Sequence, residues 1–106
     1  MKKKLETDNF VQELYSLIAK RHKSRKKESH TNFLLRAGPK KIAQKINEES
    51  GELIIDYLQG SKKRIVEETA DLIYHITLLL YSKNITIKSI ENELKKRRKF
   101  KNVRSK

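Results

Sequence analysis

Apolar residues recur every three or four positions along most of the chain, which is the spacing of one face of an α-helix. Breaks in the pattern fall at Gly38-Pro39, at Gly60 and at the Lys83-Asn84 turn. No alternating pattern of the kind that predicts a β-strand competes over a useful length. The sequence therefore predicts an all-α antiparallel bundle, with helices at about residues 8–27, 39–59, 62–82 and 87–99.

The second and third predicted helices carry acidic residues along the border of an apolar stripe. At about 100° per residue, Glu49 and Glu52 lie together beside the stripe of the second helix. Glu68, Asp71 and His75 lie along one border of the stripe of the third helix. The residues predicted to form the two stripes are Ile42, Ile46, Leu53 and Tyr57 in one helix, and Ile65, Leu72, Ile76 and Leu79 in the other.

Packing these two faces together crowds four carboxylates into a partly desolvated space, where like charges repel and each unpaired ion is costly. Two interpretations fit the pattern equally well. Lysines could neutralise the acids as a salt-bridge network, and Lys45 is the obvious cation on the same face. Alternatively, the carboxylates could bind a hard divalent cation, and oxygen ligands without cysteine suit Mg²⁺ or Mn²⁺ better than Zn²⁺.

Composition places these helices in a small, strongly basic chain of 106 residues with a formal net charge of +13 and no cysteine. Such a chain buries only a modest core by itself, so we expect one domain over residues 1–106 that gains from a partner subunit. The apolar run 72–81 supports a homodimer because it leaves little of its helix suited to solvent. At this length we expect no fused partner domain. No signal peptide or membrane span is evident, which favours a cytoplasmic protein with no membrane partner.

Much of the positive charge lies in two segments. Residues 95–106 hold eight Lys or Arg, forming a basic C-terminal tail from about residue 99, and residues 20–27 hold six more. Nucleic-acid binding through the tail is one interpretation, but no aromatic residues interleave with the basic ones as a base-stacking surface requires. We therefore favour a solvated tail and loop.

The acidic helices also resemble those of a known group of enzymes. The run KINEESGE at 45–52, followed by ETADLIYH at 68–75, resembles the E-E-x-x-E and E-x-x-D signature of the all-α MazG-like nucleoside triphosphate pyrophosphohydrolases. Further similarity at SHTNFLL (29–35) and IENELKKR (90–97) is closest to the phosphoribosyl-ATP pyrophosphohydrolase family. The sequence departs from that family's pattern at His30, where tyrosine is usual, and at Asn47 and Ser50-Gly51.

The resemblance implies hydrolysis of phosphoribosyl-ATP to phosphoribosyl-AMP and pyrophosphate in histidine biosynthesis, by a cytoplasmic homodimer that uses Mg²⁺. It implies that the paired Glu48 and Glu49 take part in catalysis. Glu48 could orient the attacking water or bind a second metal, or it could be a solvated helix glutamate. It also implies that Lys45 contacts a substrate phosphate. The metal ligands implied by the resemblance are Glu49, Glu52, Glu68 and Asp71.

Other roles are less closely tied to the motif. His75 could hydrogen-bond a ligand carboxylate, contact the substrate, or be a buried histidine satisfied by a neighbour. For Lys40, Lys41 and Arg64 we expect ordinary surface charge rather than contact with the substrate. Two alternative functions stay open. One is a house-cleaning pyrophosphohydrolase acting on other nucleoside triphosphates, and the other is a non-catalytic bundle whose basic tail binds nucleic acid.

Overall fold

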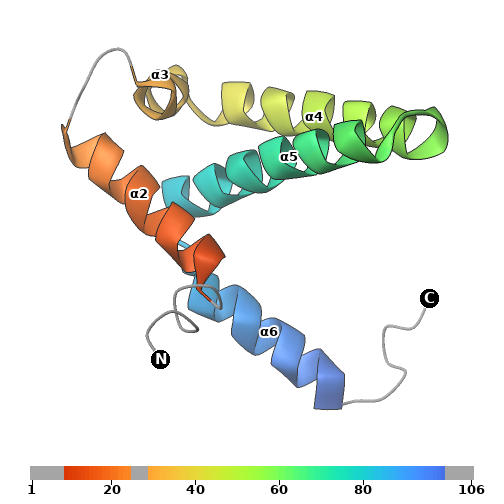
Figure 1. The fold of residues 1–106 in the computed structure, drawn as a ribbon. Coiled ribbons are helices and arrows are strands. Elements are labelled where there is room, and N and C mark those ends of the chain that lie inside the picture. Colours follow the sequence, from red (N-terminus) through yellow and green to blue (C-terminus); the bar gives the residue numbers. More distant parts are fainter. Residues whose placement is uncertain (1–8, 25–28, 100–106) are drawn as a thin grey trace.

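The structure, a computed structural model, describes residues 9–24 and 29–99, and all regular structure in these residues is helical. The all-α prediction is therefore confirmed. The helices are α2 (Phe10–Ser24), α3 (His30–Ala37), α4 (Pro39–Gln59), α5 (Lys62–Ser82) and α6 (Ile87–Lys99), and Figure 1 shows their arrangement.

Helices α4 and α5 form a long antiparallel hairpin, which is the centre of the fold (Figure 1). Both have the bounds that the sequence predicts. Pro39 occupies the first turn of α4, where its missing N–H costs nothing. At the other end, the Gly60 N–H donates to the Asp56 carbonyl at 2.7 Å, and the Ser61 hydroxyl caps α5 by accepting from the Arg64 N–H at 3.1 Å. This tight turn sets α4 and α5 side by side.

Helix α3 is not predicted from the sequence, where residues 29–35 are interpreted only as the segment that leads into the acidic helix. Its caps explain why it forms. The Ser29 hydroxyl accepts a hydrogen bond from the Asn32 N–H at 3.2 Å, and the Gly38 N–H donates to the Leu34 carbonyl at 3.1 Å. Gly38 has a φ of 97°, a conformation that a side chain would disfavour. Ser29 and Gly38 were therefore the available signals for a short helix between them.

The core lies at the end of the hairpin that α2 and α3 approach. Ile18, Leu34, Ile42 and Leu78, one from each of α2 to α5, are buried together. A hydrogen bond of 2.6 Å between the hydroxyls of Thr31 and Tyr74 adds a polar link from α3 to α5. Helices α2 and α3 thereby fix one end of the hairpin.

Two residues of the predicted stripes are exposed. Tyr57 is 74% exposed because it lies close to the hairpin turn, away from the end where α2 and α3 pack. Ile76 is 40% exposed on the side facing the groove between α5 and α6. Helix α6 runs away from the hairpin instead of packing along it (Figure 1).

Candidate functional site

Three acidic side chains from the two long helices converge on one point of the hairpin. Glu49 of α4 and Glu68 and Asp71 of α5 each offer one carboxylate oxygen, and these oxygens all lie within 4.8 Å of one another. Glu68 is buried, Glu49 is half-buried and Asp71 is exposed. This acidic group therefore opens to solvent on one side and reaches into the helix interface on the other.

Glu52 lies next to this acidic group but is not one of the three. Its carboxyl contacts that of Glu68, and this hydrogen bond, with the negative charge of Glu68, raises the pKa of Glu52 above its ordinary value. The structure thus brings together all four of the residues that resemble the family's metal ligands. Glu52 and Glu68 repel each other when both are ionised.

The acidic group has unsatisfied oxygens. Within residues 9–24 and 29–99, Oε1 of Glu49 and Oε1 of Glu68 are buried without a hydrogen-bond partner. In the same residues, no Lys or Arg forms an ion pair with Glu49, Glu52 or Asp71. Buried carboxylate oxygens are normally paired or bound to a metal. The donor set, oxygen only and strongly negative, fits a hard divalent cation of the Mg²⁺ or Mn²⁺ type.

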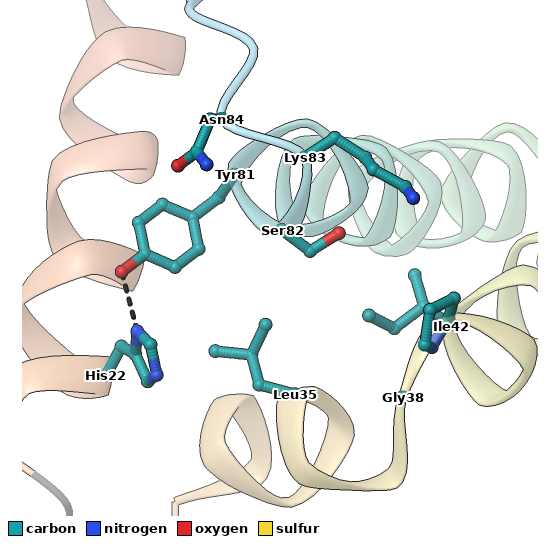
Figure 2. A pocket seen from close by; sticks show the side chains of 9 residues that line it. His22, Leu35, Gly38, Ile42, Tyr81, Ser82, Lys83 and Asn84 are labelled. Carbon is teal, nitrogen blue, oxygen red and sulfur yellow. Dashed lines mark hydrogen bonds between the residues drawn. The ribbon is translucent and has the colours of Figure 1, made fainter.

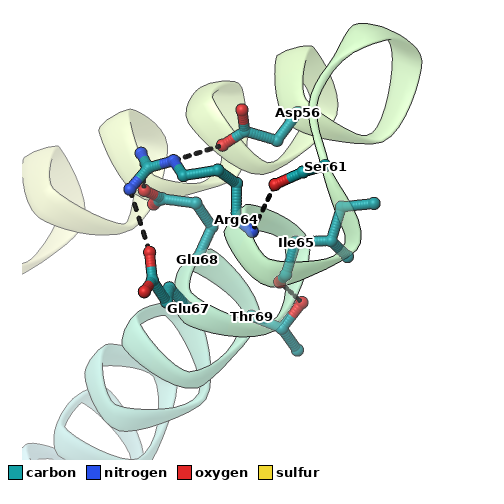
Figure 3. A network of polar contacts seen from close by, with 7 residues as sticks. All are labelled: Asp56, Ser61, Arg64, Ile65, Glu67, Glu68 and Thr69. Carbon is teal, nitrogen blue, oxygen red and sulfur yellow. Dashed lines mark hydrogen bonds and ion pairs between the residues drawn. The ribbon is translucent and has the colours of Figure 1, made fainter.

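Arg64 is the one cation that reaches the acidic group among the described residues, and it is exposed, as expected for a surface charge. Its guanidinium contacts Asp56 of α4 and both Glu67 and Glu68 of α5 (Figure 3). These carboxylates, Asp56 most of all, raise the pKa of Arg64. The spacing of four between Arg64 and Glu68 was visible in the sequence. The contact with Asp56 was not, because it crosses between helices.

Lys45 and Glu48 form a separate pair on α4. Lys45 Nζ lies 3.6 Å from Oε1 of Glu48, whose Oε2 accepts a hydrogen bond from the Gln44 amide at 3.0 Å. The Gln44 hydrogen bond, aided by the charge of Lys45, lowers the pKa of Glu48. Glu48 is exposed and Lys45 is half-buried. Glu48 is therefore held as a carboxylate outside the acidic group.

His75 is buried beside the acidic group, and its hydrogen bond differs from the carboxylate contact that we considered. Its Nδ1 donates to the backbone carbonyl of Asp71 at 2.8 Å, since a carbonyl can only accept. In the neutral ring Nε2 then carries a lone pair, and it is buried without a partner in the described part of the chain. The ring of Tyr74 packs against His75 at 5.0 Å between centroids. No pattern in the sequence indicates this unpaired acceptor.

His30, at the position where tyrosine is usual in the family, stacks on neighbouring rings. Its centroid lies 6.4 Å from that of Phe33 and 6.2 Å from that of Tyr74, and its edge faces His75 at 6.0 Å. Burial lowers the pKa of His30, and the charges of His75 and Lys45 lower it further. A neutral imidazole can thus replace the usual phenol ring as an aromatic packing partner.

A pocket of about 390 Å³ lies at the other end of the hairpin, lined by residues of α2, α3, α4 and the C-terminus of α5 (Figure 2). Its best-placed polar groups already satisfy each other, because His22 Nδ1 and the Tyr81 hydroxyl share a hydrogen bond of 2.7 Å. None of the residues that resemble the family's metal ligands lines it. We therefore assign the functional site to the acidic group rather than to this pocket.

The chain is similar to a known protein family over most of its length. Residues 11–98 match the family model described as phosphoribosyl-ATP pyrophosphohydrolase. The chain belongs to this family. The matched region contains α3 to α5 in full, and therefore the whole acidic group.

Individual relatives of this family span most of the chain. A phosphoribosyl-ATP pyrophosphatase of Sulfolobus acidocaldarius is 43% identical over 93 residues, which are 88% of this chain and 98% of that protein. One from Clostridium novyi is 37% identical over 91 residues, 86% of this chain and 83% of that protein. The histidine biosynthesis bifunctional protein HisIE of Thermotoga maritima is 41% identical over 90 residues, which are 85% of this chain and 46% of that protein.

The structure describes only part of each basic segment. Residues 20–24 end α2 and 95–99 end α6, whereas 25–27 and 100–106 lie outside the described residues. The solvated tail therefore stays a prediction, with nucleic-acid binding as its alternative, and so does the single domain over residues 1–106. None of the described helices combines the length and apolar content needed to cross a membrane.

Proposed function

We propose that the chain hydrolyses phosphoribosyl-ATP to phosphoribosyl-AMP and pyrophosphate, as the names of its relatives imply, in histidine biosynthesis. The observation that carries the proposal is the convergence of Glu49, Glu68 and Asp71, with two buried and unpaired oxygens, in a chain that belongs to this family. A phosphate-rich substrate is negatively charged and is repelled by these carboxylates, so its binding there needs a cation between them. This need supports a metal-dependent reaction.

Mg²⁺ would be held by Glu49, Glu52, Glu68 and Asp71, and Mn²⁺ suits the same oxygens. When bound, the cation neutralises charge on the phosphate oxygens of the substrate and on the leaving pyrophosphate. The raised pKa of Glu52 supports this assignment, because hydrogen bonding with Glu68 and the negative charge of that carboxylate cause it, and a cation would offset that charge. Arg64 cannot offset it alone, since its single charge is shared with Asp56 and Glu67.

The remaining polar residues can handle the substrate. In the reaction a water oxygen bonds to phosphorus, the α–β phosphoanhydride breaks and pyrophosphate departs. Glu48, ionised and exposed, would orient that water, while Glu49 takes part in catalysis as a ligand. Lys45, next to Glu48 on α4, would contact a phosphate as a point charge. The unpaired Nε2 of His75 would accept a hydrogen bond from a substrate hydroxyl.

The test is pyrophosphate release from phosphoribosyl-ATP, measured with and without Mg²⁺ and against ordinary nucleoside triphosphates. We expect release that requires the metal and prefers phosphoribosyl-ATP. A preference for other nucleoside triphosphates would assign a house-cleaning role to the same site. No release from any of these substrates would refute the enzymatic proposal.

We also propose that the chain works as a homodimer. The described chain exposes many large apolar side chains, and an apolar groove of about 290 Å³ lies between α2, α5 and α6. The exposed residues are Phe10, Val11, Leu17, Phe33, Ile54, Ile55, Tyr57, Leu58, Val66, Ile73, Ile76, Ile85, Ile90 and Leu94. Apolar surface on this scale typically marks an interaction site, and a second copy is the partner always present. Light scattering should give twice the mass of one chain, and a monomer would contradict the proposal.

A further inference from the structure

Arg64 holds three carboxylates with three different nitrogens. Its Nη2 lies 2.7 Å from Oε2 of Glu68, its Nη1 lies 3.1 Å from Oε1 of Glu67, and its Nε lies 3.7 Å from Oδ2 of Asp56 (Figure 3). Glu67 and Glu68 belong to α5, whereas Asp56 comes from α4 across the hairpin turn. A planar guanidinium held at three points has little freedom to rotate.

The two oxygens of Glu68 therefore have different surroundings. Oε2 is bound to Arg64, whereas Oε1 is buried and has no hydrogen-bond partner among residues 9–24 and 29–99. The Glu68 side chain is only 5% exposed, so water does not readily serve as the missing partner. The same carboxylate lies within 4.8 Å of oxygens of Glu49 and Asp71. One oxygen is thus anchored, and the other is left for a cation.

We propose that Arg64 is a positioning residue of the metal site, which anchors Oε2 of Glu68 so that Oε1 stays available to a divalent cation. The inference rests on the proposed function, in which Glu68 is a metal ligand. Groups that orient a ligand typically raise metal affinity, because the ligand need not be ordered when the ion binds. Asp56 and Glu67 contribute by fixing Arg64 itself, which gives these two acids a role outside the ligand set.

A competing role for Arg64 makes the opposite prediction. If the guanidinium were a stand-in cation that the metal must displace, removing it would raise metal affinity. Metal binding therefore separates the two roles by the sign of the change. A purely structural role would alter the unfolding temperature and leave the affinity of the folded protein unchanged.

The experiment is a calorimetric titration of the full chain with Mn²⁺ alone, which measures the binding affinity. We expect Arg64→Gln to weaken Mn²⁺ binding by about 10- to 100-fold, the usual cost of losing a group that orients a ligand. Arg64→Lys keeps the charge and so protects folding, but a point charge cannot bridge three carboxylates, so we expect a smaller but clear loss. Asp56→Asn, which removes the hold from α4, should weaken binding less than Arg64→Gln.

Arg97→Gln is the matched control, because Arg97 pairs with Glu93 on α6 at the same spacing of four and outside the site. It should leave Mn²⁺ affinity unchanged. Unchanged or tighter binding in both Arg64 variants would overturn the positioning role. If the unaltered chain binds no Mn²⁺, or if Asp71→Asn binds as well as the unaltered chain, the proposed metal site itself fails instead. Circular dichroism establishes that each titrated variant is folded.

Discussion

Helices α5 and α6 each carry an Arg–Glu ion pair, in opposite order along the chain and in different surroundings. In α5, Arg64 and Glu68 are 2.7 Å apart and the Glu68 side chain is 5% exposed. In α6, Arg97 and Glu93 are 3.2 Å apart and the Glu93 side chain is 48% exposed. The spacing along the helix is four residues in both cases. What differs is the packing of α4 against α5, which buries Glu68 and adds Asp56 as a further partner of the arginine.

Burial, rather than charge spacing, distinguishes the acids of the hairpin as candidate ligands of a cation. An exposed pair such as Arg97–Glu93 contributes at most about 1 kcal/mol and binds nothing else strongly. A buried carboxylate must be paired, protonated or bound to a metal. The buried carboxylates of α4 and α5 therefore need a proton, an ion pair or a metal, whereas the exposed acids of α6 do not.

The largest expected effect comes from removing ligands of the acidic group. Glu68→Gln and Asp71→Asn should each lower pyrophosphate release from phosphoribosyl-ATP by at least about 100-fold, since loss of mere supporting groups already costs 10- to 100-fold. Glu93→Gln removes the same type of carboxylate from α6 and should leave the rate unchanged. A steady-state assay at saturating Mg²⁺ measures all three. Equal rates in Asp71→Asn and the unaltered chain would mean that the acidic group is not the reaction centre.

A second contrast concerns stability. Leu78 of α5 is fully buried in the core, and Leu94 of α6 is 60% exposed. We expect Leu78→Ala to lower the free energy of unfolding by about 2–5 kcal/mol, through lost burial and a cavity. Leu94→Ala should change it by less than about 0.5 kcal/mol unless a second copy covers that residue. Urea denaturation gives both values. A large loss in Leu94→Ala would place α6 inside the dimer interface.

The smallest effect contrasts two glutamates of α4 in the metal-free protein. The pKa of Glu52 in the folded chain lies above its ordinary value of 4.5, so protonation favours folding, and stability rises as the pH falls through that pKa. The pKa of Glu48 lies below 4.5, so its contribution is present above that value and is lost as the pH falls through the folded pKa. Glu52→Gln should remove the gain in stability on acidification, and Glu48→Gln should remove the loss of stability on acidification. Thermal unfolding between neutral pH and about pH 3 with a chelator tests both signs.

Much of the fold followed from local rules. Pro39, Gly60 and Ser61 mark the ends of α4 and α5 because a missing N–H, a missing side chain and a capping hydroxyl each act within one turn of helix. The same rules could have located α3, whose caps are Ser29 and Gly38. The exposure of Tyr57 could not be predicted in this way. It depends on where α2 and α3 pack, and they pack at the opposite end of the hairpin.

The candidate site also has some features that the sequence predicts and others that it does not. The i, i+3 spacing of Glu49 with Glu52 and of Glu68 with Asp71 is a property of the sequence, and helix geometry alone sets each pair on one face. The spacing of four residues between Arg64 and Glu68 is also visible in the sequence. The sequence does not show the contact of Arg64 with Asp56, the contact of Glu52 with Glu68, or the unpaired Nε2 of His75.

The sequence by itself determined the family, the long helices and the four acids, because periodicity, caps and motif spacing are local properties. The tertiary structure decided which oxygens are buried without partners and which carboxylates one arginine ties together across the hairpin. Those features arise only when α4 and α5 pack, since burial and contacts between helices depend on distances that no single helix sets.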